Sequence, residues 1–391
     1  MGTIDKFETK NIRELWNKAQ RLVGDETITP RIIVAGKTGV GKSSLLNALL
    51  KNNVYETGVI PTTRKNAEEV WNSDKGDIIV IDAPGLGEAE APNIKESVDY
   101  EESITQLGRL DAHILLLIIK CDDRALKLEK DFIEAWNRSP ILKKLPIIIA
   151  INQIDKMKPV RDWNPNQLNL KTPREEKEKN IRAFIDYVSS LTVFEEYAIK
   201  NRIIPVSSGE SYNDPEQYGI EDLKNTLYMS LPDAAKTVFS RAAELKNKEA
   251  QRIIKNYSSG VAAAVGGNFL PGSDALVIAP IQIAMIIHLG KLHGVNVTKS
   301  TASGFLGSAG MTFTGRFIAQ ELLSFMPIFK NIIGPPLAFG LTYSLGKGIN
   351  ELLSTGKIEA TEQEFKAIIE KQGYETGQAV KQFHLQTLEK L

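Results

Sequence analysis

The stretch "VAGKTGVGKSSLLNALL", from Val34 to Leu50, decides the fold. It begins inside a charge-free apolar run, "IIVA", and continues as "SLLNALLK", which has helical spacing. Within it, residues 36–43 read G-K-T-G-V-G-K-S and satisfy the pattern G-x-x-x-x-G-K-S/T. A strand, a glycine-rich turn and a helix in this order predict a loop whose backbone N–H groups, with the helix N-terminus, surround a phosphate group.

This phosphate loop assigns roles to individual residues. Lys42 is expected to bridge the β- and γ-phosphates of a nucleoside triphosphate, and the Ser43 hydroxyl to bind Mg²⁺. The alternative is a turn between strand and helix with no ligand, for which the motif and its flanking pattern would have to coincide by chance. The residues expected to bind nucleotide here are Gly36, Lys37, Thr38, Gly39, Val40, Gly41, Lys42, Ser43 and Ser44.

Short apolar runs alternate with helical patterns from about residue 30 to residue 206. They read "RIIVAG", "DIIVID", "AHILLLIIK", "PIIIAIN" and "RIIPVSS". Runs without polar alternation are typical of strands buried on both faces of a parallel sheet. The sequence therefore predicts an α/β fold with a doubly wound, mostly parallel sheet.

Two stretches between the phosphate loop and the middle of the chain complete a predicted metal site. "IDAPG", which ends at Gly85, follows a strand, so Asp82 is expected to reach Mg²⁺ through water and the Gly85 N–H to meet the γ-phosphate. "PTTR", residues 61–64, lies between, and Thr63 is expected to complete the metal shell. Each stretch alone also fits an ordinary surface turn. We expect Mg²⁺ as cofactor, held by Ser43, Thr63 and Asp82, with Lys42, Thr63 and Gly85 as the catalytic groups.

The nucleotide base is predicted from two later strand ends. "NQID", Asn152 to Asp155, follows "PIIIAI", and the carboxyl ends of parallel strands are where such sheets bind ligands. The Asp155 carboxylate can accept two hydrogen bonds from the N1 and exocyclic amine of guanine, which adenine does not offer on that edge. "PVSS" places Ser207 and Ser208 beside the guanine oxygen. Together with Asn152 and Gln153, these residues predict a GTP and GDP site.

Taken in order, the five stretches resemble the motifs of the Era-like and septin-like P-loop GTPases. The phosphate loop looks closest to septins, GTPases of immunity-associated proteins and immunity-related GTPases. The resemblance implies GTP hydrolysis, mobile loops near Thr63 and Gly85, and a homodimer across the nucleotide face. Three positions depart from the families' patterns: Gln153 replaces a lysine that stacks on the base, Gly39 replaces the asparagine of potassium-stimulated members, and Leu86 replaces a water-orienting glutamine. Slow turnover without a partner is expected. A weaker alternative is that Arg124 or Arg64 serves as a catalytic arginine for a facing subunit.

The whole-chain composition limits the class of protein. The 391 residues favour two domains, and 48 basic residues against 48 acidic ones argue against a nucleic-acid partner held mainly by charge. The single cysteine, Cys121, suits a reducing compartment, so we expect a cytoplasmic protein. Residues 1–29 are expected to form an amphipathic helix, 30–230 the GTPase domain and 231–391 an all-α helical domain.

The helical domain resembles the uncharacterised one that follows some Era-like GTPases. Residues 275–289 are charge-free for 15 residues, fewer than the roughly 20 that a bilayer crossing needs, and contain Pro280. Buried helices of a bundle are the favoured interpretation, and peripheral membrane contact is the alternative. Two functions therefore remain open: a GTPase switch that moves the helical domain or dimerises, and a septin- or dynamin-like assembly protein whose GTP state controls a polymer or membrane association.

Overall fold

The computed structural model describes residues 3–24, 27–51, 67–71, 77–83, 100–197, 199–211, 213–267, 274–308 and 334–388. The chain divides into two compact units: Ile28–Glu244, and Met1–Thr27 together with Leu245–Leu391. The sequence-based boundary at residue 230 lies before this division, because the helix Asp233–Ala242 belongs to the first of these units.

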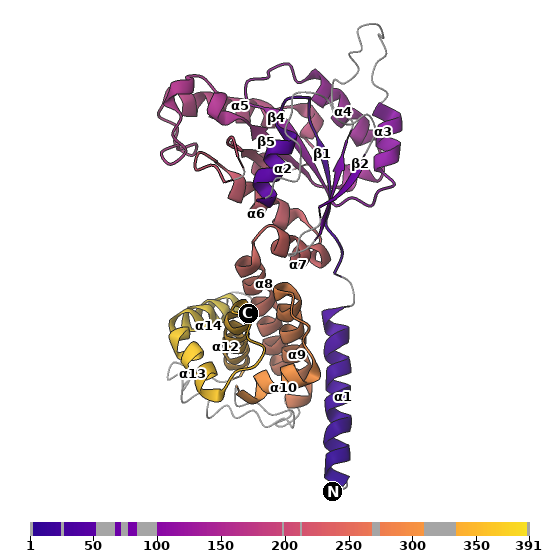
Figure 1. Cartoon of the computed structure of the whole chain (residues 1–391), viewed down its shortest axis with the longest axis vertical. Helices are drawn as coiled ribbons and strands as arrows, with labels where there is room; N and C mark the ends of the chain where they lie inside the picture. Colours follow the sequence, from indigo (N-terminus) through magenta and orange to yellow (C-terminus); the bar gives the residue numbers. More distant parts are fainter. Residues whose placement is uncertain are drawn as a thin grey trace. The chain divides into compact units, whose positions relative to one another are not determined.

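The elements of the unit Ile28–Glu244 alternate between strands and helices (Figure 1). In chain order they are β1 (Arg31–Ala35), α2 (Lys42–Leu50), β2 (Ala67–Trp71), β3 (Ile78–Asp82), α3 (Tyr100–Leu107), β4 (Ile114–Lys120), α4 (Lys127–Arg138), β5 (Ile147–Asn152), α5 (Glu176–Ser189), β6 (Ile203–Pro205), α6 (Ile220–Ser230) and α7 (Asp233–Ala242).

The described strands form one sheet in the order β2-β3-β1-β4-β5-β6. All neighbours are parallel except β2 and β3, which are antiparallel. The five predicted strands are therefore confirmed, and the predicted doubly wound, mostly parallel fold is confirmed with them. The edge strand β2 was missed, because its sequence, AEEVW, carries two adjacent acids and no apolar run.

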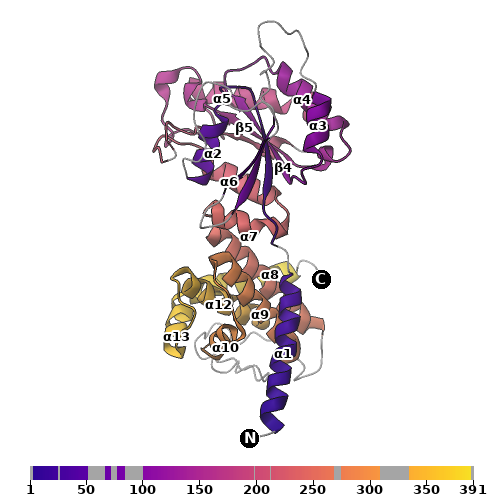
Figure 2. The ribbon, with the colours of Figure 1, turned by 45° about the vertical axis from the view of Figure 1, so that its right-hand side comes forward.

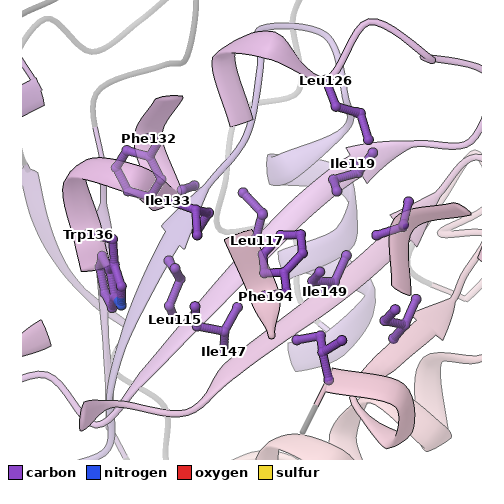
Figure 3. Close-up of a cluster of buried hydrophobic side chains, with 14 of the residues drawn as sticks. Leu115, Leu117, Ile119, Leu126, Phe132, Ile133, Trp136, Ile147, Ile149 and Phe194 are labelled. Atoms are coloured by element: carbon purple, nitrogen blue, oxygen red, sulfur yellow. The ribbon is translucent and has the colours of Figure 1, made fainter. Parts of the chain in front are cut away.

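The sheet lies between two layers of helices (Figures 1 and 2), and alternate residues of the central strands pack against opposite layers. Ile32 and Leu116 pack toward α2, α6 and α7, whereas Leu115 and Leu117 pack toward α3, α4 and α5. Figure 3 shows the second layer, where Leu115, Leu117 and Ile119 of β4 meet Phe132 and Trp136 of α4. Because both faces are covered, β4 and β5 need apolar residues at successive positions, which explains their unbroken runs.

The other unit is helical. Its described elements are α1 (Thr3–Val23), α8 (Lys246–Gly267), α9 (Asp274–His293), α10 (Lys299–Ser308), α12 (Pro335–Ser354), α13 (Glu362–Lys371) and α14 (Gly373–Leu388). Leu15, Trp16 and Ala19 of α1 lie in the same apolar core as Ile286 and Leu289 of α9. The amphipathic N-terminal helix thus packs on a helix more than 250 residues later in the chain. The Lys291 ammonium of α9 also donates a hydrogen bond to the Gly24 carbonyl, just after α1, at 3.3 Å.

No helix within the described ranges combines the length and apolar character needed to span a membrane.

Candidate nucleotide-binding site

The phosphate loop connects the end of β1 to the start of α2, and two of its glycines are required by their surroundings. A Cβ at Gly36 would lie 2.5 Å from the carbonyl oxygen of Ile118. Gly41 has φ 88°, and a Cβ there would lie 2.7 Å from Nδ2 of Asn152. Close backbone approach at one end of the loop and a left-handed turn at the other exclude larger side chains. The motif therefore folds as a tight loop ahead of a helix N-terminus.

The Lys42 side chain folds back into the loop that carries it. Its Nζ donates to the carbonyl oxygens of Gly36 at 2.8 Å and Lys37 at 3.4 Å. Val40 is buried, and Ser43 and Ser44 are half-buried in the first turn of α2. Thr38 and Gly39 are exposed at the tip of the loop. The arrangement places one cation and several backbone amides within a single turn, which suits an anion.

The Lys37 side chain contacts two acidic residues, one after the end of β4 and one in the first turn of α4, and does not point into the phosphate loop. Its Nζ lies 2.7 Å from Asp123 and 3.1 Å from Glu129, and it also donates to the Ala125 carbonyl at 2.8 Å. Burial alone would lower the pKa of Lys37, but the hydrogen bonds to Asp123 and Glu129 outweigh it and the pKa is raised. Lys37 thus ties the phosphate loop to the segment between β4 and α4, and only its main chain remains a candidate phosphate ligand.

Two amide side chains at the end of β5 attach the predicted base loop to the phosphate loop. Nδ2 of Asn152 donates to the Val40 carbonyl at 2.9 Å, and Nε2 of Gln153 donates to the Gly39 carbonyl at 3.2 Å. Asn152 is fully buried, and its Oδ1 has no hydrogen-bond partner among the described residues. An unpaired buried acceptor is costly, so this oxygen is a candidate contact for a bound ligand.

The structure joins Asp155 to the segment that follows β6. Oδ1 of Asp155 accepts a hydrogen bond from the Ser207 hydroxyl at 2.8 Å. Ser207 is held in turn by two backbone hydrogen bonds to Tyr218, each 3.0 Å long. Ser208 is also buried, 7% exposed. The two strand ends predicted to read the base therefore meet, with one Asp155 oxygen fixed by Ser207.

The candidate metal ligands are only partly described. Ser43 lies in the first turn of α2, and Asp82 ends β3 beside Val34 of β1, so a hydroxyl and a carboxylate occur at the same edge of the sheet as the loop. This donor set fits Mg²⁺, which prefers oxygen ligands and takes several of them from substrate phosphates. Thr63 and Gly85 lie outside the described residues, as do Arg64 and Leu86. Within the described ranges, no three His, Cys, Asp or Glu side chains gather as a metal site of their own.

Other groups near the site have structural partners. The Cys121 thiol donates to the Gln153 carbonyl at 2.9 Å, and burial raises its pKa to about 12. Arg124 is exposed, and its carbonyl accepts a hydrogen bond from the Tyr187 hydroxyl at 3.4 Å.

Sequence reasoning missed the buried lysine of α5. The sequence around it, residues 156–179, is polar and contains prolines, yet Lys177 is only 1% exposed, and its Nζ donates to the Asp155 carbonyl at 2.7 Å. The sequence offered no signal, because Lys177 stands in a run of charged residues, EEKEK, that fits a solvated helix.

Comparisons with known proteins relate the first part of the chain to GTPases. Residues 31–153 match the family described as 50S ribosome-binding GTPase. The chain is 37% identical over 133 residues to the uncharacterized protein YkfA of Escherichia coli K12, covering 33% of this chain and 43% of YkfA. It is 31% identical over 164 residues to the probable GTP-binding protein EngB of Lactobacillus helveticus, covering 42% of this chain and 77% of EngB.

A solved structure of Era in complex with MgGDPNP and nucleotides of 16S ribosomal RNA is 22% identical, with a TM-score of 0.35, covering 52% of this chain and 57% of that one. The chain spans about half the length of several relatives it matches, among them YkfA, YfjP of Escherichia coli and Era of Lactobacillus helveticus. The particular closeness to septins and the resemblance of the helical domain stay predictions. The ordered motifs, their geometry and the relation to EngB lead to one conclusion: the chain belongs to the Era-like P-loop GTPases.

Proposed function

We propose that the protein binds GTP with Mg²⁺, hydrolyses it to GDP and phosphate, and acts as a switch. One observation carries this proposal: Asn152 and Gln153 attach the base loop directly to the carbonyls of Val40 and Gly39 in the phosphate loop. A ligand with a base at one end and phosphates at the other would contact both loops at once. Asp155 favours guanine as that base, because its carboxylate accepts hydrogen bonds that adenine cannot donate.

The residues of the chain would divide the work of hydrolysis. Lys42 and the backbone amides of residues 39–43 would stabilise negative charge on the β- and γ-phosphates, and the Gly85 N–H would meet the γ-phosphate. Mg²⁺, held by Ser43, Thr63 and Asp82, would neutralise charge shared by these phosphates. Catalysis would consist mainly of positioning, and turnover is slow in this proposal because Leu86 offers no group to orient water.

Calorimetric titration of the full chain with GDP, GTP and ATP tests the proposal. We expect binding of both guanine nucleotides, tighter with Mg²⁺ than with EDTA, and none of comparable strength with ATP. Replacing Asp155 by Asn should move the preference from guanosine to xanthosine nucleotides, because the substituted amide donates where the carboxylate accepted. Absence of heat with every guanine nucleotide, in folded protein, would reject the GTPase function.

The consequence of the switch is a separate part of the proposal. We propose that GTP binding is coupled to movement of the helical unit or to dimerisation across the nucleotide face, since family resemblance favours both. Size-exclusion chromatography with light scattering, in GDP with aluminium fluoride, should show a dimer under the second alternative. An unchanged mass would leave movement of the helical unit, which distance measurements between labels in the two units can detect.

The assembly alternative predicts polymers or co-sedimentation with liposomes that depend on GTP. We propose a cytoplasmic place of action, for which the single cysteine is the support, with peripheral membrane contact as the outcome that liposomes would detect. The balanced charge supports the absence of a nucleic-acid partner. Filter binding to ribosomal RNA at two salt concentrations would reveal the opposite.

A further inference from the structure

A lysine of α5 is buried directly behind the predicted base loop. Lys177 lies in the first turn of α5, is 1% exposed, and donates through Nζ to three backbone carbonyls: Asp155 at 2.7 Å, Met157 at 2.5 Å and Pro159 at 3.2 Å. An ammonium group has three protons, so these carbonyls saturate it. All three belong to one short segment, the one that carries Asp155 away from β5.

The contacts of the Lys177 ammonium show that it holds together the backbone of residues 155–159. A buried charge is costly unless it is paired, and no carboxylate lies within ion-pair distance of Lys177 among the described residues. Burial lowers the pKa of Lys177, partly offset by the charge of Asp155. A methionine would fill the same volume without this desolvation. What the ammonium adds is one common hydrogen-bond partner for three carbonyls in and just after the short 3₁₀ helix Ile154–Lys156.

Contacts from Lys177 also return to Asp155 by a second route. The Lys177 ammonium lies 5.6 Å from the ring centroid of Trp163, and the Trp163 ring meets Tyr218 edge-on at 6.3 Å. Tyr218 exchanges two backbone hydrogen bonds with Ser207, whose hydroxyl donates to the Asp155 carboxylate. The main chain of Asp155 is therefore fixed by Lys177, and its side chain is fixed by a chain of contacts that begins at the same ammonium.

We propose that Lys177 is the positioning residue for base recognition: it holds the Asp155 backbone so that the carboxylate faces the N1 and exocyclic amine of guanine. This inference rests on the proposed GTP site and adds the group that sets its selectivity. It also offers a reason why the loop tolerates Gln153, since Gln153 is bonded to the phosphate loop and the rigidity of the segment comes from α5.

The test is the ratio of affinities for GDP and IDP, measured by calorimetry on the full chain. Inosine lacks the exocyclic amine, so the ratio reports the second Asp155 hydrogen bond and cancels contacts to ribose and phosphate. We expect wild type to prefer GDP by roughly 10- to 100-fold, the range for a hydrogen bond to a charged group. Lys177→Met should reduce that preference to less than about threefold, because the carboxylate would no longer be held in reach of the exocyclic amine.

Lys224→Met is the matched control. Lys224 is also fully buried, but on α6, where it pairs with Glu221 at 2.9 Å and contacts no predicted base-reading residue. Its replacement should leave the GDP-to-IDP ratio at the wild-type value even if it lowers the melting temperature. A wild-type ratio in folded Lys177→Met would overturn the proposal.

A second variant covers the case in which Lys177→Met does not fold. Trp163 is only partly buried, and Trp163→Leu breaks the second route while leaving the three carbonyl contacts in place. We expect it to lower the ratio by a smaller factor, about threefold, and an unchanged ratio would count against the proposal. Failure of wild type to bind any guanine nucleotide would instead reject the proposed function, so the two failures are distinguishable.

Discussion

The buried polar side chains of the helical unit lie within helices, whereas the buried Asn152 of the other unit lies at the end of a strand. In the helical unit, several buried or half-buried polar side chains contact one another: Gln282 donates to Thr342 at 3.1 Å, and Glu249 makes two contacts of 2.7 Å with Arg252. In the unit Ile28–Glu244, Asn152 has one amide group bonded to the phosphate loop while its Oδ1 is buried without a described partner. Polar groups bonded to each other stabilise a fold, whereas a buried acceptor left over at a strand end is suited to a ligand.

The units also differ in what their glycines and prolines do. Gly36 and Gly41 are required by close contacts and by a left-handed backbone in a loop between elements. In α9 and α12, Pro280 and Gly346 lie inside helices, and a Cβ at Gly346 would lie 2.8 Å from Ile254 of α8. The same residue types thus shape a tight loop in one unit and allow close helix packing in the other. Four experiments can break or sharpen this contrast.

The largest effect is expected for Lys42→Ala. Removing the cation from the phosphate loop should lower GTP turnover by at least about 100-fold, because the Lys42 ammonium would stabilise charge that develops on the transferred phosphoryl group. Phosphate release measures the effect. Lys51→Ala, at the exposed end of the same helix, should keep wild-type turnover. Normal turnover in Lys42→Ala would contradict the proposal that this loop binds the phosphates of GTP.

Trp16→Ala should act on the helical unit alone. Trp16 is 9% exposed and packs in the core shared with α9, so its loss should cost about 3 kcal/mol in the free energy of unfolding. Denaturant unfolding of the full chain would measure it, with Leu22→Ala, 54% exposed on the same helix, as control. Guanine-nucleotide affinity should stay at the wild-type value, and a parallel loss of affinity would show that the units are coupled.

Gly41→Ala and Gly356→Ala separate backbone strain from collision. Both glycines have positive φ, 88° and 78°, but only Gly41 has a neighbour, Asn152, within 4 Å of the added Cβ. Gly356→Ala should cost about 1 kcal/mol of stability. Gly41→Ala should cost about 1 kcal/mol more and weaken nucleotide binding as Asn152 is displaced. Equal effects on stability, with binding intact, would contradict the tight loop.

Acid should destabilise the helical unit through His288. Burial lowers its pKa to about 4, opposed by Glu249 and assisted by Arg252 and Lys291, while Tyr257 packs edge-on against the ring. An unfolded histidine takes up its proton near pH 6.5, so stability from this group is complete above that pH and is lost between about 6.5 and 4.

The expected slope is at most about 1.4 kcal/mol per pH unit. His288→Gln should flatten the pH dependence of unfolding measured in that window, and His384→Gln, at an exposed position, should leave it unchanged. An identical slope in His288→Gln would show that other groups cause the acid sensitivity.

The sequence predicts the phosphate loop, the five parallel strands and the placement of Asp155 and Ser207 at one edge of the sheet, because local chemistry constrains them. A glycine is needed where Gly41 turns, apolar runs are needed where both faces are covered, and parallel strands bring their carboxyl ends to one edge. The residues proposed to contact the phosphates and the base can therefore be predicted from the order of these motifs in the sequence.

Other features depend on partners distant in the sequence. The edge strand β2 exists through its pairing with β3, and α1 packs on α9. Lys177 is buried where the carbonyls of Asp155, Met157 and Pro159 meet at one point. In the sequence each of these reads as an ordinary polar or amphipathic segment. The sequence by itself determined which residues are candidates to bind a guanine nucleotide. Only the tertiary structure decided what holds those residues in place, because burial and saturation of hydrogen bonds are properties of neighbours in space and not of residue type.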